Sequence, residues 1–144
     1  MNWDDRLCRL GEYEWLLHLA QAQDALSKMR ELLRLRDFLI KKKKMWSRGV
    51  QQNTRSQSEI DKAEKKIQAC AAKYRAAYSA LCVLEQVLKK GNRWSMQFHQ
   101  LKDDHIKGLP AEGLGEGTRT LSWIWMAPGV VNPEMNNPQL IDGA

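Results

Sequence analysis

The chain has 144 residues, 28% of them charged and 43% hydrophobic, and a formal net charge of +6. This length fits one domain, and the composition excludes a wholly disordered protein. No apolar run approaches the roughly 18 residues of a membrane-spanning helix, and the acidic start at Asp4 and Asp5 is unlike a secretory signal peptide. We therefore expect an intracellular protein, nuclear or cytoplasmic and not secreted, with no membrane partner.

The first element is expected between about Asp4 and Trp46, where apolar residues recur at alternating steps of three and four. They are Trp15, Leu19, Ala22, Leu26, Met29, Leu33 and Ile40. This spacing is the a/d seam of a heptad repeat. Since the segment has no proline and Gly11 is its only glycine, we predict one amphipathic helix of about 35 residues and roughly 50 Å.

The seam stops between residues 47 and 57, where a glycine, an asparagine and several hydroxyl side chains replace the apolar ones. This composition predicts a loop of about ten residues. A capping box then starts the next helix, with Ser56 as N-cap and Glu59 reaching back. Ser58 with Asp61 is an alternative frame for the same motif.

A second seam keeps three-four spacing over about four heptads. Its residues are Ile60, Ala63, Ile67, Cys70, Tyr74, Ala77, Leu81, Leu84 and Leu88. Lys89 and Lys90 fall in the last turn, where cations suit the helix dipole, and Gly91 supplies the left-handed stop. Two seams of similar length joined by a short connection predict an all-α fold, an antiparallel long helical hairpin that resembles a coiled coil.

A short third helix is expected from Asn92 or Arg93 to about His105, because the large apolar residues there recur at helical spacing. It should fold back on the hairpin, since this would bury the large apolar side chains of Trp94 and Phe98. A two-helix hairpin alone also leaves much of its seam exposed.

Residues 110–144 contrast with this helical unit of residues 1–109 because glycine and proline punctuate them. In the Trp-Ile-Trp run, Trp123 and Trp125 alternate with other residues, which predicts an extended segment with aromatics on one face. The candidates for anchors that pack on the body, or alternatively on a partner chain, are Trp94, Phe98, Trp123 and Trp125. The tail from residue 127 to 144 is expected to be irregular and disordered.

Basic residues gather between Lys28 and Ser56, a window that carries +8 while the rest of the chain sums to −2. The candidates for contact with nucleic-acid phosphates are Lys41, Lys42, Lys43, Lys44, Arg48 and Arg55. They lie at the expected hairpin tip, where counterion release favours nucleic acid. The alternatives are a nuclear import signal and a solvated helix end that complements the dipole. Trp46 is the only aromatic assigned to the tip, so base stacking has little support.

No pattern indicates catalysis. The histidines and cysteines are His18, His99, His105, Cys8, Cys70 and Cys82. They show no metal-ligand spacing, and the unpaired cysteines are interpreted as packing residues. The run Asp103-Asp104-His105 is interpreted as a solvated helix end. Neither a nucleophile elbow nor a phosphate loop occurs. We therefore predict no enzyme, no metal, no cofactor and no small-molecule substrate.

Six phrases occur in this order: Gln21-Ala-Gln-Asp-Ala-Leu26, Leu33-Arg-Leu-Arg-Asp-Phe-Leu39, Arg48-Gly-Val-Gln-Gln-Asn-Thr-Arg-Ser56, Lys73-Tyr-Arg-Ala-Ala77, Leu101-Lys-Asp-Asp-His-Ile-Lys-Gly-Leu109 and Gly115-Glu-Gly-Thr-Arg-Thr-Leu-Ser-Trp-Ile-Trp125. Together they resemble the C-terminal helical region of fungal KDZ-type (Kyakuja–Dileera–Zisupton) transposase-related proteins, from about Arg6 to Trp125. The last phrase is the most specific. The resemblance implies ancestry without activity, because the family's RNase H-like core, with its metal-binding acidic residues, lies upstream of the matched region.

Family members continue after the last phrase into a further long helix, where this chain has a Pro/Asn-rich tail. The expectation is therefore a remnant or partial gene product. We predict a non-catalytic helical interaction module whose heptad seam self-associates or packs on a partner helix. The alternative is a sequence-nonspecific nucleic-acid-binding accessory that uses the basic tip.

Overall fold

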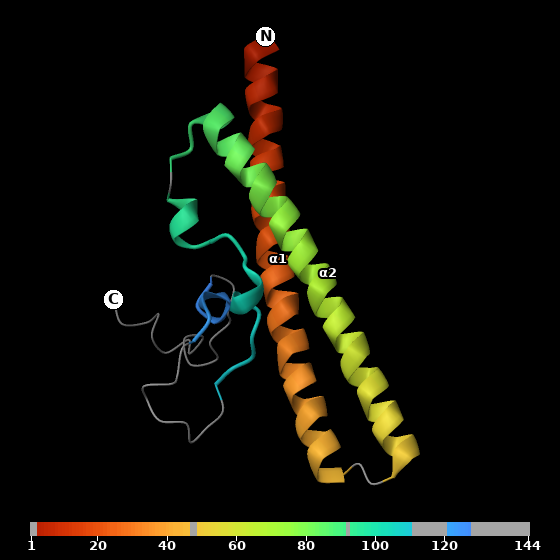
Figure 1. The fold of residues 1–144 in the computed structure, drawn as a ribbon. Helices are drawn as coiled ribbons and strands as arrows, with labels where there is room; N and C mark the ends of the chain where they lie inside the picture. Colours follow the sequence, from red (N-terminus) through yellow and green to blue (C-terminus); the bar gives the residue numbers. More distant parts are fainter. Residues whose placement is uncertain (1–2, 47–48, 92, 111–120, 128–144) are drawn as a thin grey trace, which may run out of the picture.

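The computed structural model describes residues 3–46, 49–91, 93–110 and 121–127. Two long helices, α1 (Trp3–Trp46) and α2 (Val50–Leu88), run antiparallel and form a hairpin (Figure 1). The remaining elements are the single-turn 3-10 helices η1 (Trp94–Met96), η2 (Asp103–His105) and η4 (Trp123–Trp125). These described residues contain no strand. The predicted all-α class and its long helical hairpin are confirmed.

The two predicted seams meet in the middle of the hairpin. Their buried members are Trp15, Ala22, Leu26, Met29 and Leu33 from α1, and Ala63, Ile67, Cys70, Tyr74, Ala77 and Leu81 from α2. Burial of each Leu, Ile or Met side chain contributes about 1.5–3 kcal/mol. The two seams therefore bury each other. A partner chain would have to bind a different face of the hairpin.

Gly11 marks the point along α1 where α2 ends. A Cβ at Gly11 would lie 2.9 Å from Cδ2 of Leu88, so the missing side chain lets the last turn of α2 pack directly on α1. Just beyond this contact, Lys90 Nζ pairs with Glu12 Oε2 at 2.6 Å. Residues 4–10 extend past it and are all exposed. The N-terminal end of α1 thus projects beyond α2 (Figure 1).

The connection between the helices is shorter than predicted. α2 begins at Val50, and its N-cap is Gly49 with a φ of 96°, a conformation that glycine adopts without a steric penalty. Ser56 and Glu59 therefore lie inside the helix, and the predicted capping box is wrong. The polar residues after Gly49 include no proline, so nothing stops the helix from extending to the tip.

The C-terminal end of α2 also differs from the prediction. The helix ends at Leu88, and Lys89, with a φ of 54°, is the left-handed C-cap whose N–H donates to the Glu85 carbonyl. Gly91, the predicted stop, also has a positive φ, of 71°. Lys90 lies beyond the helix rather than in its last turn, because the left-handed conformation of Lys89 ends the helix before it. Its side chain pairs with Glu12 on α1.

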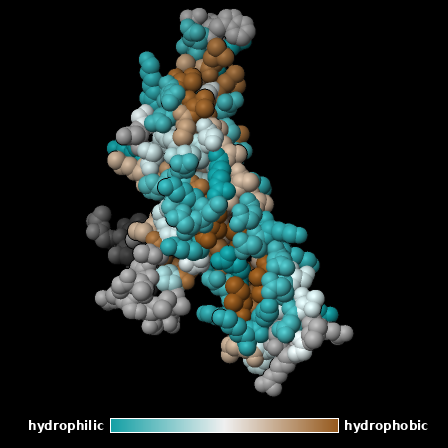
Figure 2. All heavy atoms as spheres, in the orientation of Figure 1, coloured by the Kyte–Doolittle hydropathy of each residue, from teal (hydrophilic) through white to brown (hydrophobic). Residues whose placement is uncertain are grey.

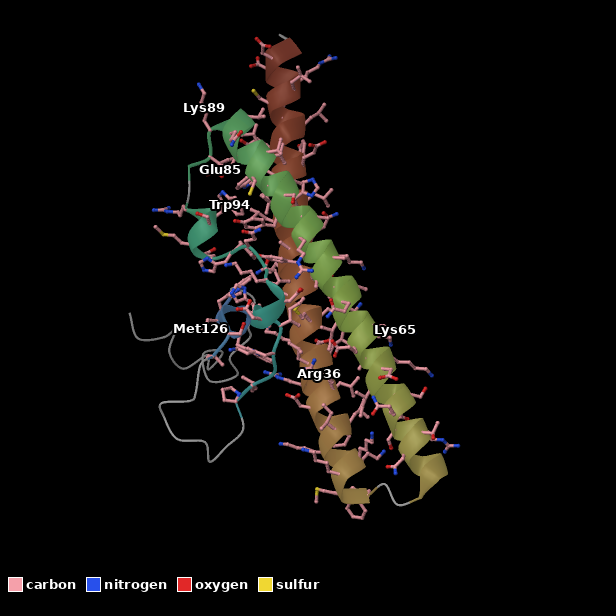
Figure 3. All side chains as sticks on the ribbon, in the orientation of Figure 1. Arg36, Lys65, Glu85, Lys89, Trp94 and Met126 are labelled. Carbon is pink, nitrogen blue, oxygen red and sulfur yellow. The ribbon has the colours of Figure 1, made fainter. Side chains whose placement is uncertain are left out.

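The predicted continuous third helix is replaced by η1 and η2 with non-helical chain between them. The segment does fold back on the hairpin as expected, with Trp94, Phe98 and Leu101 all buried. The Trp94 side chain lies between η1 and the hairpin (Figure 3). The chain is more extended here than a helix would be, so the three side chains are buried at different places along the hairpin. These tertiary contacts outweigh the local preference for a helix.

Candidate interaction surfaces

Aromatic rings form a continuous series between the hairpin and the segments that fold back on it. Trp15 meets Trp94 edge-on at 5.7 Å between centroids, and Trp94 lies 5.3 Å from Tyr78. Tyr78 stacks on Tyr74 at 6.2 Å, and Tyr74 lies 5.7 Å from Trp123. Such pairs add about 0.5–1.5 kcal/mol each beyond the area they bury. The series joins η1 and η4 to the two long helices.

The Trp-Ile-Trp run is a 3-10 turn rather than the extended segment that the alternation predicted. Ile124 is fully buried, Trp125 is buried and Trp123 is half-buried. The turn rotates successive side chains by roughly 120°, so that Ile124 enters the core between the two indoles. The structure thus places all four predicted anchors, Trp94, Phe98, Trp123 and Trp125, against the hairpin of the same chain.

Arg30 fixes this turn to α1, a role that the sequence analysis did not assign to it. Its side chain is only 5% exposed, and Nη1 donates to the Ile124 carbonyl at 2.8 Å while Nη2 donates to Ser27 Oγ at 3.0 Å. Burial, and secondarily the charge of Arg34, lower the pKa of Arg30. The position beside the seam residue Met29 was the one available signal, since it brings a long side chain to the edge of the core.

An exposed apolar surface lies along the N-terminal part of α1. We call it the N-terminal stripe and define it as Leu7, Leu10, Tyr13 and Leu17. All four are exposed, Leu10 to 61% and Tyr13 to 71%. Steps of three, three and four place them on one side of the helix, opposite the buried seam. Figure 2 shows apolar side chains gathered at this end. Isolated exposed leucines are ordinary, whereas a contiguous row of exposed apolar side chains is a candidate for an interaction surface.

A second exposed surface lies near the hairpin tip, on the face of α1 that points away from α2. Phe38, Lys41, Lys42, Met45 and Trp46 line a groove there with a volume of about 380 Å³. Its apolar residues are strongly exposed, Trp46 to 72%. We call these five residues the tip groove. The sequence analysis did not assign Phe38 and Met45 to the tip, because they precede it on the helix. Their spacing of seven residues nevertheless indicates a shared face.

The predicted phosphate-contacting residues do not form one group. Lys41 and Lys42 flank the tip groove, whereas Lys43 turns toward α2 and its Nζ donates to Gln57 Oε1 at 2.6 Å. Lys44 is exposed at the end of α1, Arg55 is exposed on α2, and Arg48 lies outside the described residues. The structure thus brings two of the six predicted cations together with aromatic side chains.

In the acidic run Asp103-Asp104-His105 at η2, Asp103 forms an ion pair with Arg75. Asp103 Oδ1 accepts from Arg75 Nη2 at 2.7 Å, and Arg75 Nε donates to the Leu101 carbonyl at 3.1 Å. Within the described parts of the chain, no three His, Cys, Asp or Glu residues are grouped so that they could hold a metal ion. None of the described helices is both long and apolar enough to cross a membrane.

Comparisons with protein-family models, with curated proteins and with solved structures found no match to this chain.

Proposed function

We propose that the protein is a non-catalytic helical interaction module that docks through its N-terminal stripe, with a second copy of the chain as the partner. The observation that carries the proposal is the exposure of the stripe, because its apolar side chains lie on the face of α1 that points away from α2. The hairpin seams are occupied inside the chain, so this stripe replaces them as the docking surface. The transposase ancestry remains part of the proposal and is supported by the sequence resemblance between Arg6 and Trp125.

The spacing of the stripe favours a parallel pairing of two copies. Leu10, Tyr13 and Leu17 take successive a, d and a positions of a heptad. Arg9 and Glu14, both exposed, then take the flanking g and e positions. In a parallel pair, the g residue of one copy faces the e residue five positions later in the other. Opposite charges at these positions support that register.

The stripe is short, so the expected self-association is concentration-dependent. Light scattering should report a mass that rises from 16.7 kDa toward twice that value with protein concentration, and added salt should not reverse the rise because burial of apolar surface drives it. Leu10→Glu should keep the protein monomeric. Val83→Glu is the matched control, because Val83 is equally exposed at the same end of the hairpin but on α2.

Charge exchange tests the register. Arg9→Glu should weaken the pair, and combining it with Glu14→Arg should restore it. A monomer at every concentration, or a dimer that Leu10→Glu leaves intact, would refute the proposed surface. The non-catalytic part has its own test: metal-dependent nuclease activity that copurifies with the protein would overturn it.

A further inference from the structure

The tip groove combines apolar rings with cations on a single face of α1. Phe38, Lys42 and Met45 follow one another at steps of four and three, and Lys41 and Trp46 flank them. Neither lysine takes part in an ion pair among the described residues. The nearest preceding acidic residue on the helix, Asp37, lies four positions before Lys41, but its carboxylate is against Gly108. Within the part of the chain that the structure describes, both ammonium groups at the groove are therefore without an ion-pair partner.

We propose that the tip groove binds single-stranded nucleic acid, with Phe38 and Trp46 as stacking platforms for bases and Lys41 and Lys42 as phosphate contacts. This inference is independent of the proposed self-association, which uses the opposite end of α1. A single strand exposes the flat face of each base next to a phosphate, and a groove with alternating rings and cations matches that repeat. In a duplex the base faces are stacked on one another and are inaccessible to the two rings.

The order of residues around the helix distinguishes this partner from an anionic membrane. On a helical projection, Lys42 lies between the Phe38/Met45 pair and Trp46, within the apolar face rather than at its edge. A membrane-bound helix separates an apolar face from a cationic one, because insertion would otherwise bury an ammonium group below the headgroups. The interleaved pattern instead favours a ligand that presents rings and charges in turn.

The test measures binding of the full chain to a fluorescently labelled oligothymidylate and to a duplex of the same length, by anisotropy across a salt series. We expect tighter binding to the single strand. Trp46→Ala should weaken it by about tenfold or more, whereas Trp46→Phe, which keeps a ring, should lose much less. Lys41→Ala with Lys42→Ala should weaken binding and reduce the slope of log affinity against log salt by about 1.4.

The matched charge control is Lys65→Ala with Lys66→Ala, which removes the same charge from exposed positions on α2 outside the groove. This pair should bind the single strand nearly as well as the unaltered chain. Circular dichroism establishes that each variant keeps the hairpin. Equal affinity for duplex and single strand, an unchanged affinity after Trp46→Ala, or an equal loss in the α2 control would overturn the proposal. Binding to phosphatidylserine vesicles without binding to the oligonucleotide would overturn it in favour of a membrane.

Discussion

The indole of Trp123 donates its N–H to Nδ1 of His105 at 3.0 Å. The same Nδ1 accepts the backbone N–H of Lys102 at 3.1 Å. Since Nδ1 accepts from both groups, the hydrogen-bond pattern assigns the imidazole proton to Nε2. Ser122 Oγ also donates to the His105 carbonyl, at 2.5 Å. His105 therefore joins η2 to η4, two turns that lie far apart along the chain.

Replacement of His105 by alanine should loosen this junction. Trp123 and Lys102 would each lose an acceptor, and a lost hydrogen bond typically costs about 1 kcal/mol. We expect a lower urea midpoint and a weaker near-ultraviolet circular dichroism signal from the tryptophans. His105→Asn is the control, because its amide oxygen can stand in place of Nδ1. An alanine variant as stable as the asparagine variant would show that the junction contributes nothing.

Arg30→Met should release the Trp123–Trp125 turn from α1. The methionine keeps the apolar stem, but the Ile124 carbonyl loses its 2.8 Å donor, and an unsatisfied buried acceptor costs about 1–3 kcal/mol. Limited trypsin digestion should then cut the chain faster at the basic residues near η2. Arg34→Met is the comparison: its guanidinium lies 5.4 Å over the Trp125 ring at an exposed position, where such a contact contributes about 0.5–1 kcal/mol. Equal losses from the two variants would contradict the role given to Arg30.

Gly11→Ala sets two effects against each other. Alanine favours the helix over glycine by about 0.5–1 kcal/mol, while its Cβ would meet Cδ2 of Leu88 at 2.9 Å. That atom is the end of a half-buried side chain near the helix terminus, so it can rotate away at small cost. Thermal unfolding should show a modest net stabilisation. Gly11→Leu, which needs far more space, should instead lower the melting temperature; a stabilising Gly11→Leu would mean that the close approach at Leu88 is unimportant.

Tyr74 should make stability sensitive to alkali. Burial, with smaller effects of Tyr78 and Cys82, raises the pKa of Tyr74 well above its ordinary value, and the neutral hydroxyl donates to the His99 carbonyl at 2.6 Å. Because the folded pKa exceeds the unfolded value of about 10, this contribution is fully present below about pH 10 and is lost as pH rises further. Urea unfolding from pH 8 to 11 should show the decline.

Tyr74→Phe supplies the control for that experiment. The variant should lose about 1 kcal/mol near neutral pH with the hydrogen bond, and its stability should fall less steeply above pH 10. An equally steep alkaline decline in Tyr74→Phe would assign the sensitivity to other groups, such as Tyr78, whose pKa burial also raises.

Periodicity alone determined the hairpin. The three-four spacing from Trp15 to Leu33 and from Ala63 to Leu81 specifies which face of each helix is apolar, and two such faces in one chain cover each other. Composition likewise located the basic residues near the tip. These features are local, so a single sequence contains them.

The tertiary structure determined the features that depend on contacts between segments far apart in the sequence. The helical spacing of Trp94 and Phe98 predicted a third helix, but the chain follows a more open path along the hairpin. There Trp94 packs against Trp15 and Tyr78, and the Tyr74 hydroxyl donates to the His99 carbonyl. The buried role of Arg30 depends on the Ile124 carbonyl, 94 residues away. The same reason applies to the N-terminal stripe: its residues are spaced for a partner in the sequence, but only the tertiary structure shows that they are exposed on the side of α1 away from α2.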